Sequence, residues 1–107
     1  MKKHDLNNMI GGWFIGDFNP TLHKTKDFEV ALKSYNKNDF EAEHFHKIAT
    51  EYTVIIDGEV IMSGKHYKTG DIIIIKPNES TDFKALTDVK TLVVKVPSVK
   101  NDKFIIQ

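Results

Sequence analysis

The sequence predicts an all-β domain built from two packed antiparallel sheets. Segments rich in β-branched and aromatic residues recur along the 107-residue chain, and Gly, Asn, Asp and Pro turn signals separate them. No segment shows a helical period over three turns. Short strands with turn signals at this frequency are typical of a small barrel or sandwich.

The N-terminal part predicts an arm and two strands. Residues 1–10 are expected to form a flexible arm, and a single barrel domain is expected over 11–107. A first strand is predicted over 13–18, where Asn19-Pro20 ends it. Over 28–33 apolar residues, Val30 and Leu32 among them, alternate with more polar ones, which indicates a half-buried strand.

The remaining strands follow in close succession. Asp57-Gly58 stands between TVII and EVIM and predicts a tight hairpin, because both central residues of such a turn need positive φ. Four isoleucines at 72–75 predict a strand that is buried on both faces. The other expected strands cover 80–85, 90–96 and, at a closing sheet edge, 104–106.

Composition narrows the classes of function. The 15 basic residues balance 15 acidic ones, so no nucleic-acid partner is expected. Cysteine is absent, so a metal site must use His, carboxylate or water ligands. The longest apolar run, 72–75, is far too short to span a bilayer. The N-terminal residues contain no unbroken apolar stretch as long as that of a signal peptide. We therefore expect a cytoplasmic protein without a membrane partner.

Two imidazoles and a carboxylate lie close together in the sequence. In a strand, His44 and His46 point to the same face, about 7 Å apart. Glu51 has the opposite parity and joins them only if the chain turns between Lys47 and Thr50 and returns as a neighbouring strand. Two His and one carboxylate form an open site for zinc or ferrous iron. The alternative is a polar strand end with a solvated glutamate.

The spacing of these residues resembles the first motif of the cupin family. That motif combines a Gly, a His-x-His pair, a Glu and a second Gly, and the chain offers His44, His46, Glu51 and Gly58 at this spacing. Asn38 stands five residues before His44, near where the motif begins. A chance match has a probability of roughly one in a thousand for this composition.

The second cupin motif follows after a short interval. Gly70 begins it, and Lys76-Pro77-Asn78 stands where the family has Pro-x-Gly. Asn78 can adopt the left-handed conformation that Gly supplies. Thr81 then occupies the position of the family's third metal-binding His. The resemblance implies a small single-domain cupin, a double-stranded β-helix or jelly-roll barrel, whose second-motif His is replaced by Thr81.

The resemblance also implies three candidate functions. The first is a divalent-metal site of His44, His46 and Glu51, holding iron, manganese, zinc or nickel and open to a small polar ligand such as a carbohydrate derivative. The second follows from the sequence 44–47, which is similar to the His-x-His-Lys of metal-free sugar-nucleotide ketoisomerases. There His44 or His46 would act as the catalytic acid and base. The third is a non-catalytic ligand-binding module.

Three further residues are expected to line the pocket. Thr53 has the parity of Glu51, Thr81 stands at the lost ligand position, and Phe83 shares a face with Thr81. Open sheet edges and a limited core lead us to expect a homodimer, formed through 13–18 or through the C-terminal strand.

Overall fold

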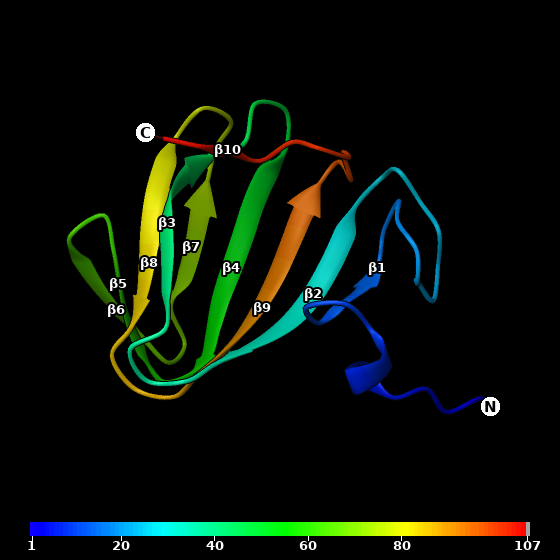
Figure 1. Cartoon of the computed structure of the whole chain (residues 1–107), viewed down its shortest axis with the longest axis horizontal. Coiled ribbons are helices and arrows are strands. Elements are labelled where there is room, and N and C mark those ends of the chain that lie inside the picture. Colours follow the sequence, from blue (N-terminus) through cyan, green and yellow to red (C-terminus); the bar gives the residue numbers. More distant parts are fainter. Residues whose placement is uncertain (107) are drawn as a thin grey trace.

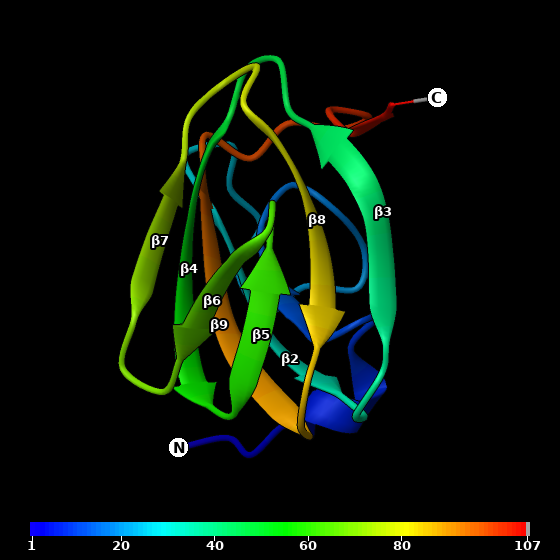
Figure 2. The same ribbon diagram turned by 90° about the vertical axis from the view of Figure 1, so that its left-hand side faces the viewer.

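Two five-stranded antiparallel sheets face each other in the computed structural model, which describes residues 1–106 (Figures 1 and 2). The first, the β4 sheet, contains in spatial order β1 (Trp13–Ile15), β2 (Glu29–Tyr35), β9 (Val89–Val96), β4 (Thr50–Asp57) and β7 (Ile72–Ile75). The second, the β3 sheet, contains β10 (Phe104–Ile105), β3 (Phe40–Phe45), β8 (Ser80–Ala85), β5 (Glu59–Met62) and β6 (Lys65–Lys68). The predicted fold class is confirmed. Residue 107, the last of the predicted domain, lies outside the described residues.

The N-terminal segment contains a short 3-10 turn, η1 (Leu6–Asn8). Asp5 caps this turn by accepting a hydrogen bond from the backbone N–H of Asn7 at 2.9 Å. A β-bridge between Ile10 and Trp13 then leads into β1. None of the described residues belongs to a helix that is long and apolar enough to cross a membrane.

The hairpin predicted at Asp57-Gly58 is wrong, because the chain changes sheets there. Strand β4 pairs with β9 and β7, whereas β5 pairs with β6 and β8. Gly58 has φ +110°, and a Cβ at this position would lie 2.5 Å from the carbonyl oxygen of Asp88. The corner therefore requires glycine, but for close packing between the sheets rather than for a hairpin.

The burial predicted for 72–75 is also wrong. Strand β7 is the last strand of the β4 sheet, and the side chains on its outer face are exposed rather than covered by a further layer. Ile75 faces the interior and is 8% exposed, whereas Ile72 and Ile74 are 65% and 54% exposed. The strand predicted over 13–18 is shorter than expected and ends at Ile15. Asn78 has φ +71°, the left-handed conformation expected at a glycine position of the motif.

The interior is apolar at one end and polar at the other. The hydrophobic core comprises Ile55, Val60, Met62, Ile75, Phe83, Ala85 and Val89. Along β4 the inward side chains run from Ile55 in this core to Thr53 and Glu51, which line a pocket. On β2 the inward side chains are Ala31, Lys33 and Tyr35.

Asp102 fixes the loop that joins the two sheets beside the pocket. Its buried carboxylate accepts hydrogen bonds from the backbone N–H groups of Lys47 and Ala49, both at 2.9 Å, and of Ile48 at 3.2 Å. Burial alone would raise the pKa of Asp102, but these three donors lower it. Residues more than fifty positions apart thus set where β3 ends and β4 begins.

Replacing Asp102 with Asn should destabilise the protein. The amide presents N–H donors to a loop that already offers three donors, so we expect the free energy of unfolding to fall by about 1.5–3 kcal/mol. Urea denaturation measures this change. Asp57→Asn, at an exposed carboxylate, is the matched control and should have little effect. Equal effects of the two substitutions would contradict the role of Asp102.

Candidate functional site

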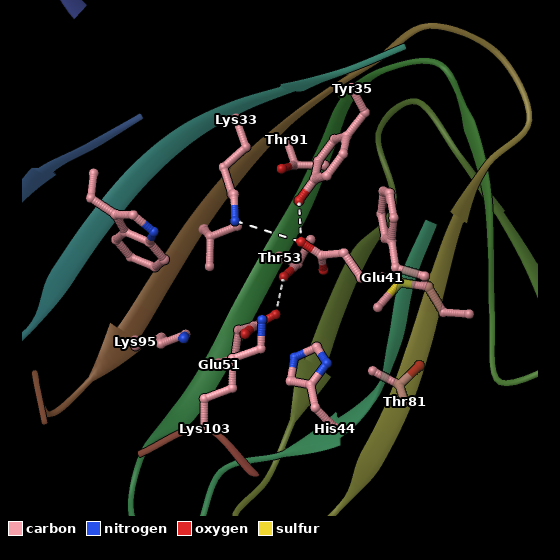
Figure 3. Close-up of a pocket in the computed structure, with 14 residues that line it drawn as sticks. Lys33, Tyr35, Glu41, His44, Glu51, Thr53, Thr81, Thr91, Lys95 and Lys103 are labelled. Atoms are coloured by element: carbon pink, nitrogen blue, oxygen red, sulfur yellow. Dashed lines mark hydrogen bonds and ion pairs between the residues drawn. The ribbon is translucent and has the colours of Figure 1, made fainter. Parts of the chain in front are cut away.

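A pocket opens between the sheets at the polar end of the interior and contains a cavity of about 60 Å³ (Figure 3). Strands β2, β4 and β9 form one wall, and β3 and β8 form the other. The lining residues are Trp13, Lys33, Tyr35, Glu41, His44, Glu51, Thr53, Met62, Thr81, Phe83, Thr91, Val93, Lys95 and Lys103.

The structure brings five of the six sequence-predicted site residues together in this pocket, whereas His46 lines a neighbouring hollow beside Asp102. His44 on β3, Glu51 and Thr53 on β4, and Thr81 and Phe83 on β8 all line the pocket. Thr81 pairs directly with His44 across β3 and β8. The chain does turn between Lys47 and Thr50, as the sequence requires, but it returns in the facing sheet rather than in a neighbouring strand.

His46 lies just beyond β3, is 3% exposed, and sits beside His44, with 5.4 Å between the ring centroids. In both residues Nδ1 contacts a backbone carbonyl: that of Ala42 at 3.0 Å for His44, and that of Asp102 for His46. A carbonyl oxygen can only accept a hydrogen bond, so each Nδ1 carries a proton. In the neutral imidazoles Nε2 is therefore the nitrogen with a free lone pair.

Glu51 is the anionic centre of the pocket. Its Oε1 lies 3.4 Å from Nε2 of His46, and its Oε2 accepts a 2.7 Å hydrogen bond from the hydroxyl of Thr53 (Figure 3). Burial alone would raise the pKa of Glu51. The contacts with His46 and Thr53 and the charge of Lys95 outweigh this effect and lower the pKa to about 2. Glu51 is a carboxylate at every physiological pH.

The types of donor atom in the pocket suit a divalent metal ion, but the side chains are not yet arranged around a common point. Nε2 of His46 is buried and has no hydrogen-bond partner, and an unpaired polar atom of this kind is costly unless something binds it. Two imidazole nitrogens and one carboxylate are accepted ligands of zinc and iron. Yet nowhere in residues 1–106 are three His, Asp or Glu side chains already gathered around one point. The hydroxyl of Thr81 accepts a hydrogen bond from Ser63 and donates one to the carbonyl of Asp82, so it is already engaged within the protein.

Several pocket residues were missed by sequence reasoning. Tyr35 donates a hydrogen bond to Glu41 at 3.3 Å, and Lys33 lies 3.7 Å from the same carboxylate. Burial, together with the negative charge of Glu41, raises the pKa of Tyr35, which is therefore a neutral phenol. Burial lowers the pKa of Lys95. Lys33 and Tyr35 alternate with Val30 and Leu32 along the strand, so the sequence shows that the two pairs face opposite sides. It favours the apolar pair for the inner face, whereas the structure places Lys33 and Tyr35 there.

Comparison with solved structures identifies the fold. An uncharacterised conserved protein with a double-stranded β-helix domain from Klebsiella pneumoniae matches with a TM-score of 0.69 and 23% identity, over 76% of this chain and 71% of that chain. KdgF from Halomonas sp. matches with a TM-score of 0.65 and 16% identity, over 72% and 74% of the two chains. Pac13 from Streptomyces, a nucleoside dehydratase, matches with a TM-score of 0.68 and 14% identity, over 78% and 71%.

No protein-family profile matches the sequence, and no curated protein matches it. The structural likeness is therefore one of fold. The chain has the double-stranded β-helix fold of the cupins, as its two motifs predict.

The depressed pKa of Glu51 predicts a specific pH dependence of stability. The stabilisation is complete above the unfolded value of 4.5 and is lost as the pH falls through about 2 in the folded state. This shift corresponds to about 3 kcal/mol. In metal-free buffer, the difference in free energy of unfolding between the wild type and Glu51→Gln should shrink on acidification from pH 5 to 2. Parallel pH profiles of the two proteins would contradict the assignment.

Proposed function

We propose that this cupin-fold protein binds a divalent metal ion through His44, His46 and Glu51 and takes a small polar ligand, such as a carbohydrate derivative, in the adjoining pocket. One observation carries the proposal: the buried Nε2 of His46, which lacks a hydrogen-bond partner, lies 3.4 Å from the carboxylate of Glu51, whose pKa is lowered. A cation between these groups would satisfy both.

The residues around the donors support this role. The carbonyl of Asp102 fixes the ring of His46, and the carbonyl of Ala42 fixes that of His44, so that both Nε2 atoms are available. Thr53 holds Glu51 by its second oxygen. The remaining coordination positions would be open, because Thr81 does not replace the lost imidazole. A bound divalent ion would supply Lewis-acid chemistry or activate water.

The polarity and size of the pocket support a small ligand. The hydroxyls of Tyr35, Thr53 and Thr81 line a cavity of about 60 Å³ beside the two carboxylates. That volume accommodates about four or five water molecules. Pac13, which shares the fold, has been solved with uridine, a small polar ligand that carries a sugar. A sugar derivative could place one polar end inside the pocket and extend the rest outward.

A metal-free acid–base function is the second candidate, and one observation favours it. His46 lies between the carbonyl of Asp102 at Nδ1 and the carboxylate of Glu51 near Nε2. Each of these acceptors could receive a hydrogen bond from the ring when both of its nitrogens carry protons. In this state His46 would hold a proton without a metal ion, and the neighbouring His44, which lines the pocket, would exchange protons with the ligand.

Metal content tests the first proposal. Protein produced without a His tag and loaded with zinc should contain about one ion per chain by elemental analysis, because two His and one carboxylate suffice. The His44→Ala/His46→Ala double variant should contain almost none, whereas His66→Ala, which removes an exposed imidazole on β6, should retain the metal. Thr81→His should raise zinc affinity, since it restores a fourth ligand opposite His44.

Two outcomes of the zinc measurement would contradict the metal proposal. Zinc content below about a tenth per chain after loading, or equal content in the double variant and the wild type, would remove the metal proposal. Solvent deuterium uptake into a nucleotide-sugar keto intermediate, abolished by His44→Ala in metal-free protein, would then establish the acid–base function. Absence of both zinc binding and deuterium uptake, together with ligand-induced thermal stabilisation, would identify a binding module.

A further inference from the structure

Two lysines point into the pocket from strand positions that normally hold apolar side chains. Lys33 on β2 and Lys95 on β9 lie on the inner face of the β4 sheet (Figure 3). The ammonium group of Lys33 is partnered by Glu41 at 3.7 Å. In the described part of the chain, no carboxylate lies within 4 Å of the half-buried ammonium of Lys95. Desolvating a lysine without a partner is costly, which indicates that something binds it.

Trp13 holds both ammonium groups at the same end of the pocket. Its ring centroid lies 5.1 Å from Nζ of Lys95 and 5.7 Å from Nζ of Lys33. A cation–π contact stabilises the positive charge but leaves the N–H donors of each lysine free. Lys103 also lines the pocket, so three ammonium groups face the two carboxylates of Glu41 and Glu51. Glu29 and Glu51 flank Lys95 on the two neighbouring strands, but among the described residues neither carboxylate lies within 4 Å of its ammonium group, so the N–H donors of Lys95 stay available to a ligand.

We propose that Lys95, supported by Lys33 and Trp13, binds an oxyanion of the ligand, a carboxylate or a phosphate, while the polar remainder of that ligand faces His44 and Glu51. The inference rests on the proposed function in that both place the ligand in this pocket. A cavity of about 60 Å³ restricts the enclosed part of the ligand to a small group. The substrate class is therefore an acidic hydroxylated molecule rather than a neutral sugar.

Titration with small anions tests this subsite. Glycolate should bind to the wild type, and its neutral isostere glycolamide should not, as followed by ¹H–¹⁵N chemical shifts. Lys95→Met keeps the length of the side chain and removes the charge, so glycolate affinity should fall at least tenfold, whereas Lys95→Arg should retain it. Lys84→Met, at an exposed position on β8, is the matched control and should leave affinity unchanged. Inorganic phosphate in a parallel series distinguishes the two oxyanions.

The outcomes separate this inference from the proposed function. Anion binding that survives in the His44→Ala/His46→Ala variant but is lost in Lys95→Met supports the subsite, whatever the metal content. Anion binding that requires zinc and is unchanged in Lys95→Met overturns the subsite and leaves the metal proposal standing. Absence of glycolate and phosphate binding up to tens of millimolar, or equal affinity for glycolate and glycolamide, also overturns it.

A second inference comes from the opposite side of the β4 sheet. Two rows of apolar residues cross four strands on its outer face, and we call these eight residues the outer apolar face. Cross-strand pairing joins them as Val30, Val94, Tyr52 and Ile74 in one row and Leu32, Leu92, Val54 and Ile72 in the other. None carries a charge, although an antiparallel sheet that faces water normally presents polar side chains there.

The exposed area approaches that of a standard interface. Ile72, Ile74 and Tyr52 are 65%, 54% and 38% exposed, and the other five residues are half-buried. Together with the neighbouring Ile56 and Val96 these side chains expose on the order of 600 Å², which approaches the ~800 Å² that each partner buries in a standard interface.

We infer that a second copy of this chain covers the outer apolar face, as two sheets packed face to face. The face is bordered at one end by the exposed polar pair Ser34 and Lys90, as expected for an apolar interface with a polar rim. The chain has 15 basic and 15 acidic residues, so two copies do not repel each other through net charge. This assigns the homodimer to a surface other than 13–18 or the C-terminal strand. Trp13 instead lines the pocket and packs against Phe18.

The solution mass tests this dimer. Light scattering at 10–100 µM should give the mass of two 12.3 kDa chains for the wild type. Ile74→Glu should give a monomer with a folded amide spectrum, whereas Ile48→Glu should remain dimeric, because Ile48 is equally exposed at 57% but lies elsewhere. Ile74→Thr, which keeps a β-branched residue, serves if the glutamate variant fails to fold.

Two results would overturn the interface. A monomeric wild type at 100 µM would assign the outer apolar face to a different protein. Dimeric Ile74→Glu and dimeric Tyr52→Glu would place the dimer contact on another surface.

Discussion

The carboxylate of Asp102 and its three backbone N–H donors at Lys47, Ile48 and Ala49 are the interaction on which the site depends. They close the loop that carries the chain from the β3 sheet to the β4 sheet. The carbonyl of the same residue fixes the ring of His46. One residue near the C-terminus therefore determines both how far His46 lies from Glu51 and which of its nitrogens faces that carboxylate.

At its pocket end, the β4 sheet departs from the usual distribution of polar and apolar residues. Its inner face carries Lys33, Glu51 and Lys95, and its outer face carries two rows without a charge. Both departures have the same physical meaning, because each places side chains where they are unfavourable unless another molecule contacts them. An acidic ligand inside and a second chain outside would resolve both. The core at the other end of the barrel, around Ile55 and Phe83, provides the stability that permits this arrangement.

Sequence reasoning predicted the fold because turn signals and the two-motif spacing are local features. The motif register also set His44 beside Thr81, and both line one pocket with Glu51, although Glu51 reaches it from the facing sheet and not from the neighbouring strand that the sequence suggested. Sequence reasoning failed to predict the burial of β7 and the turn at Asp57-Gly58, because both depend on how the two sheets are arranged in space. The four isoleucines of β7 have the same local pattern in a central strand and at a sheet edge. Asp57-Gly58 has the same pattern in a hairpin and in a corner between sheets. The backbone donors that bind Asp102 and the Trp13 ring that contacts Lys95 are distant in the sequence and have no local signal.

The protonation of His46 tests the central claim most directly, because the metal site and the acid–base site require different states of one ring. Long-range ¹H–¹⁵N correlation spectra distinguish the neutral tautomers from the imidazolium. If the metal proposal is right, one equivalent of zinc at pH 7 should leave the proton of His46 on Nδ1 and cause a large shift of its Nε2 resonance. An imidazolium whose two nitrogen resonances do not shift when zinc is added would contradict the metal proposal.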